Sequence, residues 1–286
     1  MCPIILINRA DRPERLLDSL SELRGVKMVS NVVRMEACLP EEAQRLRFEH
    51  LDYQSYDNIT NNQGETLVIP TWGALACGIS HQRCWEYISN GSFEHGLVVE
   101  DDIVFRDDRF GFYINAAKKV LKKNPNTPLC IFFGASNHTG LDYYTNDIHG
   151  GLAMDDPLPD ESRERVNGLI TGCHCYLVNL RGARYLLEEI VQFRYQVDIE
   201  ISMLTTSPPN TRNGMFDFKC LNYPNCGVEQ KKNLDSDVQI ISYNRIGKFL
   251  PHVPSNVLGL IRSYLPKYNL YDYVSRLDPF EVIINV

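Results

Sequence analysis

The chain has 286 residues, of which 44% are hydrophobic and 23% are charged, a composition that is ordinary for a globular protein with a substantial core. Its formal net charge is -7 at pH 7, and its Lys and Arg residues form no strongly basic block. Because nucleic-acid backbones are bound by clustered Lys and Arg, this charge argues against nucleic acid as a partner.

The amino-terminal segment predicts a β-strand and no export signal. Residues 1–8 lack a basic region, and their apolar run is too short for a signal peptide. No stretch approaches the roughly 18 apolar residues of a membrane span. The nine cysteines are scattered and odd in number, which favours reduced thiols. We therefore expect a cytoplasmic protein, and the sequence does not establish any contact with a membrane.

The predicted elements alternate between strands and helices along the chain. The strand at 3–8 leads into a helix opened by Pro13, since proline is favoured in a first helical turn. A strand near 29–35 and a short charged helix near 41–47 follow. The polar segment 52–70 has no helical period, and we interpret it as a mobile loop.

The middle of the chain continues this alternation. A helix at 73–89 runs directly into a strand at 96–100, and a helix at 109–123 precedes a buried strand at 129–134. The irregular, polar segment 135–161 has the length that is typical of a functional lid.

The last part completes the pattern. Apolar, β-like sequence at 167–180 precedes a helix at 181–193, and a short strand follows at 216–221. The whole pattern predicts an α/β fold with a mostly parallel, Rossmann-type sheet flanked by helices. We assign residues 1–239 to this domain and residues 240–286, which are aromatic and punctuated by proline, to a carboxy-terminal extension with one amphipathic helix.

Three adjacent carboxylates, Glu100, Asp101 and Asp102, directly follow the apolar strand at 96–100. In open α/β sheets, ligands bind beyond the carboxyl ends of the strands. Neighbouring carboxylates repel one another, and a cation is the usual compensation. If the strand continued, Glu100 and Asp102 would share a face while Asp101 pointed away. Such hard oxygen ligands suit Mg or Mn carrying a diphosphate, whereas the alternative is a solvated acidic turn.

Several motifs that bear polar or catalytic residue types occur in a fixed order between residues 3 and 238. They are Asn8 with Arg12-Pro13-Glu14-Arg15-Leu16, Cys77 with Ser80-His81 and Trp85, Glu100-Asp101-Asp102, Gly172-Cys173-His174-Cys175-Tyr176 with Gly182-Ala183, Val197-Asp198, and Gln230 with Ser236-Asp237-Val238. The ordered set resembles glycosyltransferase family 25, which includes lipopolysaccharide glycosyltransferases and collagen galactosyltransferases.

The resemblance implies a GT-A fold, a nucleotide-sugar donor that is commonly a UDP-sugar, and usually Mn. It further implies an inverting hexosyltransferase, such as a galactosyltransferase, acting on a hydroxyl of a glycan, a lipid-linked glycan or a protein. Ala74 stands where a Glu is often found in the family, and Cys173 stands where a Thr is usual. These two departures leave the donor and the acceptor open.

The donor side is assigned partly from residue chemistry. The amide of Asn8, at a strand end, could hold a uracil or ribose, and Arg12 and Arg15 at a helix start could meet a diphosphate. The alternative for both arginines is a solvated helix face, and an isolated histidine such as His81 is more often a core residue. With the resemblance, the predicted donor-binding residues are Asn8, Arg12, Arg15, Ser80, His81, Asp101 and Gln230, beside the metal ligands Glu100, Asp101 and Asp102.

Two further residue groups need an interpretation. The run 173–175 does not predict zinc, because alternate residues on a strand face opposite ways and no second cysteine pair completes a tetrahedral site. A lone Asp such as Asp198 usually caps a helix, but its family match makes it the predicted general base. Glu200 is the fallback, since it would share a face with Asp198 on a strand but not on a helix.

The alternative to an enzyme is a non-catalytic nucleotide-sugar-binding or scaffold protein that keeps the same fold. The intact acids argue against it, and hydrolysis of the donor without an acceptor would separate the two possibilities.

Overall fold

The computed structural model describes residues 2–26, 32–61, 69–106, 109–138, 169–206, 218–223 and 226–231. The predicted extension at 240–286, the Ser236-Asp237-Val238 motif and residues 139–161 of the predicted lid lie outside these residues.

A six-stranded sheet forms the centre of the structure, with the strand order β2-β1-β3-β8-β5-β9. Its strands are β1 (Ile4–Asn8), β2 (Val32–Glu36), β3 (His95–Glu100), β5 (Leu129–Phe133), β8 (Cys175–Asn179) and β9 (Lys219–Tyr223). Strand β1 pairs in parallel with β2 and β3, and β5 pairs in parallel with β9. Only β8 runs antiparallel to both of its neighbours, so the predicted mostly parallel α/β sheet is confirmed.

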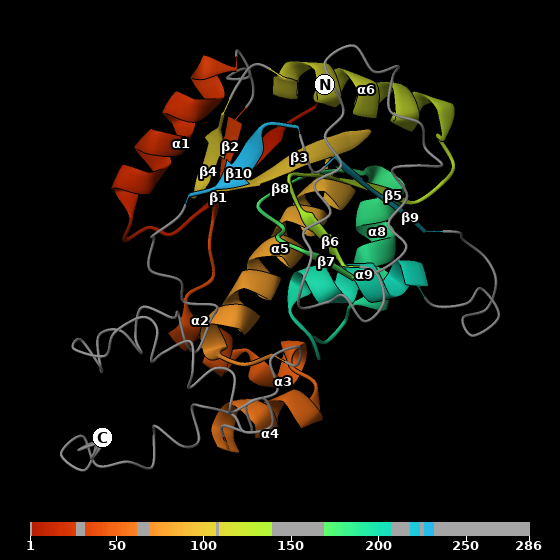
Figure 1. The fold of residues 1–286 in the computed structure, drawn as a ribbon. Coiled ribbons are helices and arrows are strands. Elements are labelled where there is room, and N and C mark those ends of the chain that lie inside the picture. The colour runs from red at the N-terminus through yellow and green to blue at the C-terminus, as the bar shows by residue number, and fades with distance from the viewer. Residues whose placement is uncertain are drawn as a thin grey trace, which may run out of the picture.

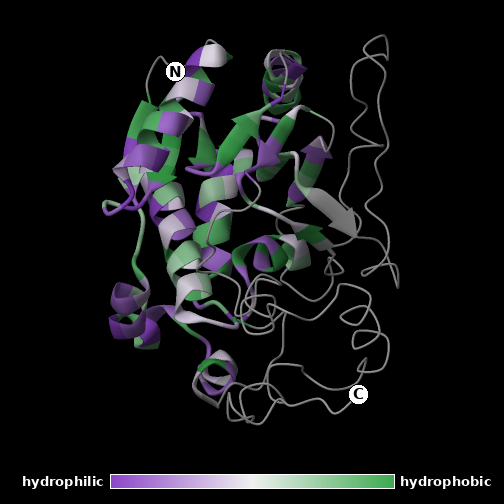
Figure 2. Ribbon diagram, turned by 60° about the vertical axis from the view of Figure 1, so that its left-hand side comes forward, coloured by the Kyte–Doolittle hydropathy of each residue, from purple (hydrophilic) through white to green (hydrophobic). Residues whose placement is uncertain are grey.

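Helices cover both faces of this sheet (Figure 1). They are α1 (Pro13–Gly25), α5 (Trp72–Asn90), α6 (Arg109–Lys123), α8 (Leu180–Glu189) and α9 (Val197–Thr206). On β1, Ile4 and Leu6 pack toward α1 and α6, whereas Ile5 and Ile7 pack toward α5, α8 and α9. Strands β1, β5 and β8 are buried along their whole length, as expected for strands covered on both faces, and the centre of the sheet is largely green in Figure 2. The edge strand β2 is only partly buried.

Two small antiparallel pairs supplement the sheet. They join β4 (Ile103–Phe105) to β10 (Val228–Gln230) and β6 (Ser136–His138) to β7 (Leu169–Thr171). The strand predicted at 216–221 corresponds to β9, and β10 follows it. Because β10 pairs with β4, residues 228–230 lie close to the turn between β3 and β4.

The segment predicted as a mobile loop, 52–70, contains helix α4 (Tyr53–Asn61), so this prediction is wrong for that part. The inward face of α4 carries polar residues that have partners. Ser55 donates a hydrogen bond to the carbonyl oxygen of Arg194 at 2.8 Å, and Asn58 donates one to the carbonyl oxygen of Ile69 at 3.0 Å. Both side chains are buried, and a search for apolar periodicity passes over such a helix.

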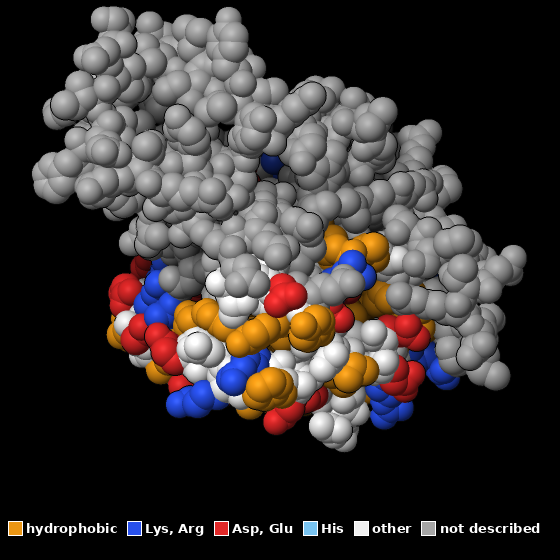
Figure 3. All heavy atoms as spheres, turned by 90° about the horizontal axis from the view of Figure 1, so that it is seen from below, with side chains coloured by type: hydrophobic (Ala, Val, Ile, Leu, Met, Phe, Trp, Pro, Cys, Tyr) orange, Lys and Arg blue, Asp and Glu red, His pale blue; other side chains and the backbone are white. Residues whose placement is uncertain are grey.

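Helices α2 (Pro40–Arg45) and α3 (Arg47–His50) replace the single helix predicted near 41–47. Figure 3 views the molecule from the end at which α3 and α4 lie, where hydrophobic side chains are exposed among charged ones. Phe48 is 78% exposed, and the guanidinium of Arg47 lies 4.2 Å from the centre of its ring. In the described part of the chain, no helix is both long and apolar enough to cross a membrane.

Replacing Asn58 by Ala should destabilise the protein by about 1–3 kcal/mol, because it leaves the buried carbonyl of Ile69 without this donor. Urea unfolding measures the effect. Thr60→Ala is the control in the same helix, since its exposed hydroxyl donates to the carbonyl oxygen of Tyr56 within α4, and it should change stability by about 0.5 kcal/mol or less. Equal effects of the two substitutions would show that Asn58 does not anchor α4.

Candidate active site

The carboxyl end of β3 brings together residues from strands that are distant in sequence. Glu100 is the last residue of β3, and Asn8 is the last residue of its parallel neighbour β1. Strand β8 runs the other way, so its start lies at the same edge, where the backbone N–H of Glu100 donates to the carbonyl oxygen of His174 at 2.9 Å. Asp101 and Asp102 form the turn between β3 and β4.

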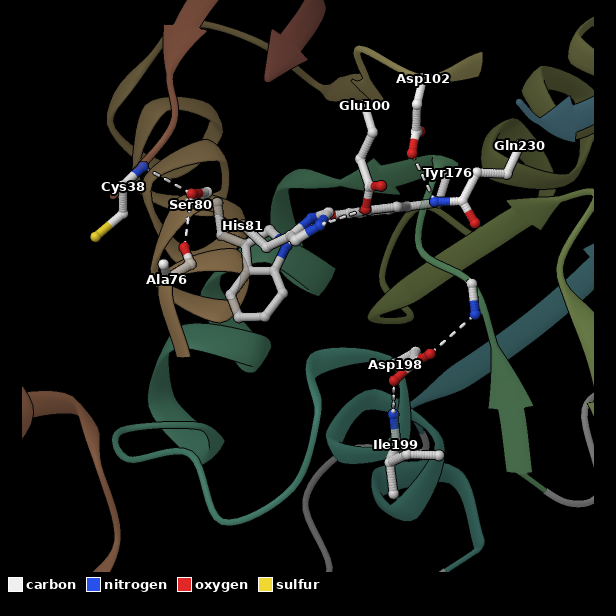
Figure 4. Close-up of polar contacts among 12 residues, drawn as sticks. Cys38, Ala76, Ser80, His81, Glu100, Asp102, Tyr176, Asp198, Ile199 and Gln230 are labelled. Atoms are coloured by element: carbon white, nitrogen blue, oxygen red, sulfur yellow. Dashed lines mark hydrogen bonds and ion pairs between the residues drawn. The ribbon is translucent and has the colours of Figure 1, made fainter. Parts of the chain in front are cut away.

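The carboxylate of Glu100 points toward α5 (Figure 4). Its Oε1 atom lies 3.1 Å from Nε2 of His81, which is fully buried. Burial by itself raises the pKa of Glu100, but the hydrogen bond with His81 lowers it, and the net change is downward. The other ring nitrogen of His81 lies 3.0 Å from the hydroxyl of Tyr176. His81 thus stands behind Glu100, with both nitrogens engaged inside the protein.

Asp101 points instead toward β1 and α1. Its Oδ2 accepts a hydrogen bond from Nδ2 of Asn8 at 2.7 Å, and its Oδ1 lies 3.6 Å from the guanidinium of Arg15. The Asn8 amide also donates to the carbonyl oxygen of Arg12 and accepts from the guanidinium of Arg34. The structure therefore brings together four predicted donor-side residues, and their contact with a nucleotide stays a prediction.

Asp102 turns toward β10. Its Oδ2 accepts a hydrogen bond from Nε2 of Gln230 at 2.7 Å, which unites two residues that the sequence motifs predicted separately. Its Oδ1 is buried and has no partner among the described residues. Burial, followed by the negative charge of Glu100, raises the pKa of Asp102 to about 7 from its ordinary value of 3.8.

Asp198 approaches the same region from the first turn of α9 (Figure 4). Its Oδ2 accepts from the backbone N–H of Gly172, and its Oδ1 accepts from that of Ile199, both at 2.9 Å. Burial raises the pKa of Asp198, the two backbone hydrogen bonds oppose this effect, and the charge of Glu100 adds to it. Three partly buried acids therefore interact electrostatically at this end of the sheet.

The sequence model described as "Glycosyltransferase family 25 (LPS biosynthesis protein)" matches residues 3–201, which include all three of these acids. The chain belongs to glycosyltransferase family 25. It is therefore a glycosyltransferase, as the ordered motifs predicted. A comparison with curated proteins found no match.

Solved structures resemble this family 25 member only distantly. An active-site mutant of LgtC aligns with 12% identity and a TM-score of 0.38 over 90% of this chain and 99% of that one. Galactosyltransferase LgtC in complex with donor and acceptor sugar analogues aligns with 10% identity and a TM-score of 0.37, over the same shares of the two chains. Because both scores are below 0.5, the assignment to family 25 rests on the matched sequence.

Two predicted residues of the family 25 chain have structural partners. Ser80 accepts a hydrogen bond from the backbone N–H of Cys38 and donates one to the carbonyl oxygen of Ala76 (Figure 4). Glu200 accepts from the backbone N–H groups of Arg194 and Tyr195, so it ties the segment before α9 to the beginning of that helix. Glu200 was the fallback candidate for the general base, because on a strand it would share a face with Asp198. Residues 197–206 form a helix instead, so the two side chains do not share a face.

Sequence reasoning missed His174 as a residue of this site. Its side chain is buried, and neither ring nitrogen has a hydrogen-bond partner within the described ranges. Burial lowers its pKa, although the charges of Glu100 and Glu229 oppose this effect. The sequence placed His174 in a family motif and weighed the run 173–175 as a zinc site, but it gave His174 no role in the site. The pairing of β3 with β8 brings His174 to the site.

Cys77, His81 and Glu100 form a group whose potential ligand atoms lie within 4.8 Å of one another. Burial, followed by the charges of Glu100 and Asp198, raises the pKa of Cys77 well above its ordinary value, so the thiol stays protonated. A thiol must ionise to bind a metal well. Both ring nitrogens of His81 also have partners already, Tyr176 and Glu100, so a metal bound to His81 would have to displace one of them.

Replacing Asp102 by Asn should remove a pH dependence of stability from the metal-free enzyme. Because the pKa of Asp102 is about 7 in the folded state and 3.8 ordinarily, the folded state binds the extra proton and loses stability as the pH rises through this interval. Asp102→Asn cannot ionise. It should be more stable than the wild type above about pH 7, by at most about 4 kcal/mol at about 1.4 kcal/mol per pKa unit, and similar near pH 4.

Urea unfolding in EDTA at both pH values measures this difference. Asp18→Asn is a suitable control, since the Asp18 side chain is 70% exposed and loses only a surface ion pair with Lys231. A stability difference between wild type and Asp102→Asn that is the same at both pH values would mean that Asp102 is not held protonated.

Proposed function

We propose that this glycosyltransferase moves a sugar from a nucleotide-sugar donor, a UDP-sugar, to an acceptor hydroxyl, with Mn or Mg as its cofactor. The supporting observation is the state of Asp102, whose buried Oδ1 has no partner among the described residues and whose pKa is raised to about 7 beside Glu100. A cation next to these oxygens would remove the repulsion between the two carboxylates. The residues thus fit a hard divalent ion.

Glu100 and Asp102 would hold the cation, which when bound neutralises negative charge on the diphosphate of the donor. Asp101 already contacts Asn8 and Arg15. Its proposed role is therefore to hold these two side chains where the nucleotide-sugar donor would bind. Arg15 then supplies positive charge where a diphosphate would lie. The position of these three acids at the carboxyl end of a central strand, β3, also supports a GT-A-like architecture.

Asp198 is the proposed general base. It lies within electrostatic range of Glu100, and its pKa is raised by burial. A base with a raised pKa accepts a proton more readily while it can still ionise near neutral pH. The carboxylate takes the proton of the acceptor hydroxyl, whose oxygen bonds to the anomeric carbon from the face opposite the nucleotide. The nucleoside diphosphate leaves with the electron pair of the broken bond, and the configuration inverts.

The acceptor belongs to the class of glycans, lipid-linked glycans or proteins that carry a free hydroxyl. The description of the family as an LPS biosynthesis protein supports a glycan or a lipid-linked glycan. We also propose the cytoplasm as the location, because all nine cysteines are free thiols and most are buried.

UDP together with Mn should raise the melting temperature, because a ligand that binds only the folded state stabilises it by about 2.7 kcal/mol at a concentration 100 times its Kd. EDTA should reverse the effect. Scanning fluorimetry with UDP, Mn, both or neither gives the comparison, and Asp102→Asn serves as the matched variant that loses the Mn response. Equal stabilisation by UDP with and without EDTA would contradict a cation-bridged site.

Asp198→Asn should lower turnover by about 100 to 10,000-fold, the usual range for a general base, while donor affinity stays near the wild-type value. Transfer rates at saturating donor, beside donor dissociation constants, separate these effects. Glu200→Gln is the control in the same helix and should leave turnover nearly unchanged, since an amide oxygen can still accept from the backbone N–H groups of Arg194 and Tyr195. Weaker donor binding with unchanged turnover in Asp198→Asn would make Asp198 a binding or capping residue.

Transfer also separates the enzyme from a non-catalytic binding protein with the same fold. The wild type should release UDP from a UDP-sugar faster with an acceptor glycan than without one, in the presence of Mn. A protein that binds UDP and Mn yet neither transfers nor hydrolyses any UDP-sugar in a donor panel would support the binding protein instead.

A further inference from the structure

A chain of three hydrogen bonds runs from the protein interior to Glu100 (Figure 4). Nε1 of Trp85 lies 2.8 Å from the hydroxyl oxygen of Tyr176, which lies 3.0 Å from Nδ1 of His81. Nε2 of His81 lies 3.1 Å from Oε1 of Glu100. Trp85, His81 and Tyr176 are 0% exposed, and the Glu100 side chain is 21% exposed. Only the last member of the chain therefore reaches the site.

The direction of these hydrogen bonds follows from the chemistry of the first residue. An indole N–H can only donate, so the oxygen of Tyr176 accepts from Trp85. The hydroxyl proton of Tyr176 then has one acceptor, Nδ1 of His81, and the ring proton of a neutral His81 must sit on Nε2. From there it donates to the carboxylate of Glu100.

The opposite tautomer would leave polar groups unsatisfied. With its proton on Nδ1, His81 would turn the lone pair of Nε2 toward a carboxylate oxygen 3.1 Å away, and the Tyr176 hydroxyl would have no acceptor within the chain of contacts. Unpaired polar groups in a buried place cost about 1–3 kcal/mol each. The arrangement Trp85 to Tyr176 to His81 to Glu100 is therefore the one that satisfies every group.

We propose that Tyr176 is a positioning residue for the cation site: it fixes the tautomer of His81, which holds one carboxylate oxygen of Glu100 and leaves the other for the cation. The contact with His81 is made by Oε1 of Glu100, not by Oε2. The proposal rests on the proposed function only in taking Glu100 as a cation ligand. The direction of the hydrogen bonds does not depend on it.

The fold fits this role. Trp85 and His81 lie four residues apart on α5, so they occupy the same side of that helix. Tyr176 lies on β8, next to the strand that carries Glu100. Its hydroxyl contacts the side chains of both Trp85 and His81. The helix, the two strands and the carboxylate are thus joined by polar contacts in a region that is otherwise a hydrophobic core.

The direction of the hydrogen bonds can be tested on the wild-type protein without metal. Long-range proton–nitrogen NMR of 15N-histidine protein distinguishes the two imidazole tautomers, and His81→Asn identifies the His81 signals among the seven histidines. We expect the proton on Nε2. A proton on Nδ1 overturns the proposal, and this measurement needs no substitution at Tyr176.

The positioning role is tested with Tyr176→Phe, which removes one oxygen and leaves His81 free to change tautomer. Changes to residues that support a metal ligand typically weaken metal affinity about 10–100-fold, and we expect a loss of this size for Mn, measured by electron paramagnetic resonance of free Mn. The Mn concentration needed for half-maximal transfer should rise equally, while turnover at saturating Mn recovers to near the wild-type value.

Tyr223→Phe is the matched control, because Tyr223 is also buried but packs on the opposite face of the sheet. It should leave the affinity for Mn unchanged. Trp85→Phe keeps the Tyr176 hydroxyl and should weaken Mn binding less than Tyr176→Phe, which provides a second variant if the first fails to fold.

The outcomes separate the two proposals. Wild-type protein that binds no Mn contradicts the proposed cation and, with it, the role of Tyr176. Wild-type protein that binds Mn, with the same affinity in Tyr176→Phe, contradicts the positioning role alone. An equal loss of affinity in Tyr223→Phe would also overturn it, since the effect would then be a general loss of stability.

Discussion

The burial of three neighbouring carboxylates, Glu100, Asp102 and Asp198, is the constraint on which the rest of the site depends. Glu100 is compensated by a hydrogen bond from His81, and its pKa is lowered. Asp198 receives two backbone N–H groups, but its pKa is still raised. Among the described residues, Asp102 has only the amide of Gln230 as a side-chain hydrogen-bond donor, and its pKa shows the clearest rise. The compensation is therefore weakest at Asp102, and a bound cation would stabilise that residue most.

The family motifs contain residues with two different physical tasks. Asn8, Glu100 and Asp198 lie among the charged groups of the site. Gly182 instead preserves the packing of α8, because a Cβ there would lie 2.7 Å from the carbonyl oxygen of Leu129. Asn179 receives the backbone N–H groups of Gly182 and Leu129, which ties β8 to β5. A motif residue is thus not automatically a functional one.

Local sequence predicts what local forces determine. The apolar runs and helical periods at 3–8, 73–89 and 109–123 correspond closely to β1, α5 and α6. Strand direction is not local, so the antiparallel course of β8 could not be read from its apolar residues. The contact between His81 and Tyr176 spans 95 residues and depends on that direction. In α4, Ser55 has its partner 139 residues away, at the carbonyl oxygen of Arg194, and this buried polar contact leaves no apolar period in the sequence.

The segment 172–174 links the two sides of the candidate site through backbone groups. Gly172 has a φ of 97°, a conformation that favours glycine, and its N–H donates to Asp198. Two residues later, the carbonyl oxygen of His174 accepts from Glu100. The proposed base and the proposed cation ligand are therefore held by the same short turn. A side chain at Gly172 would strain that turn, so we expect Asp198 and Glu100 to lose their alignment together rather than separately.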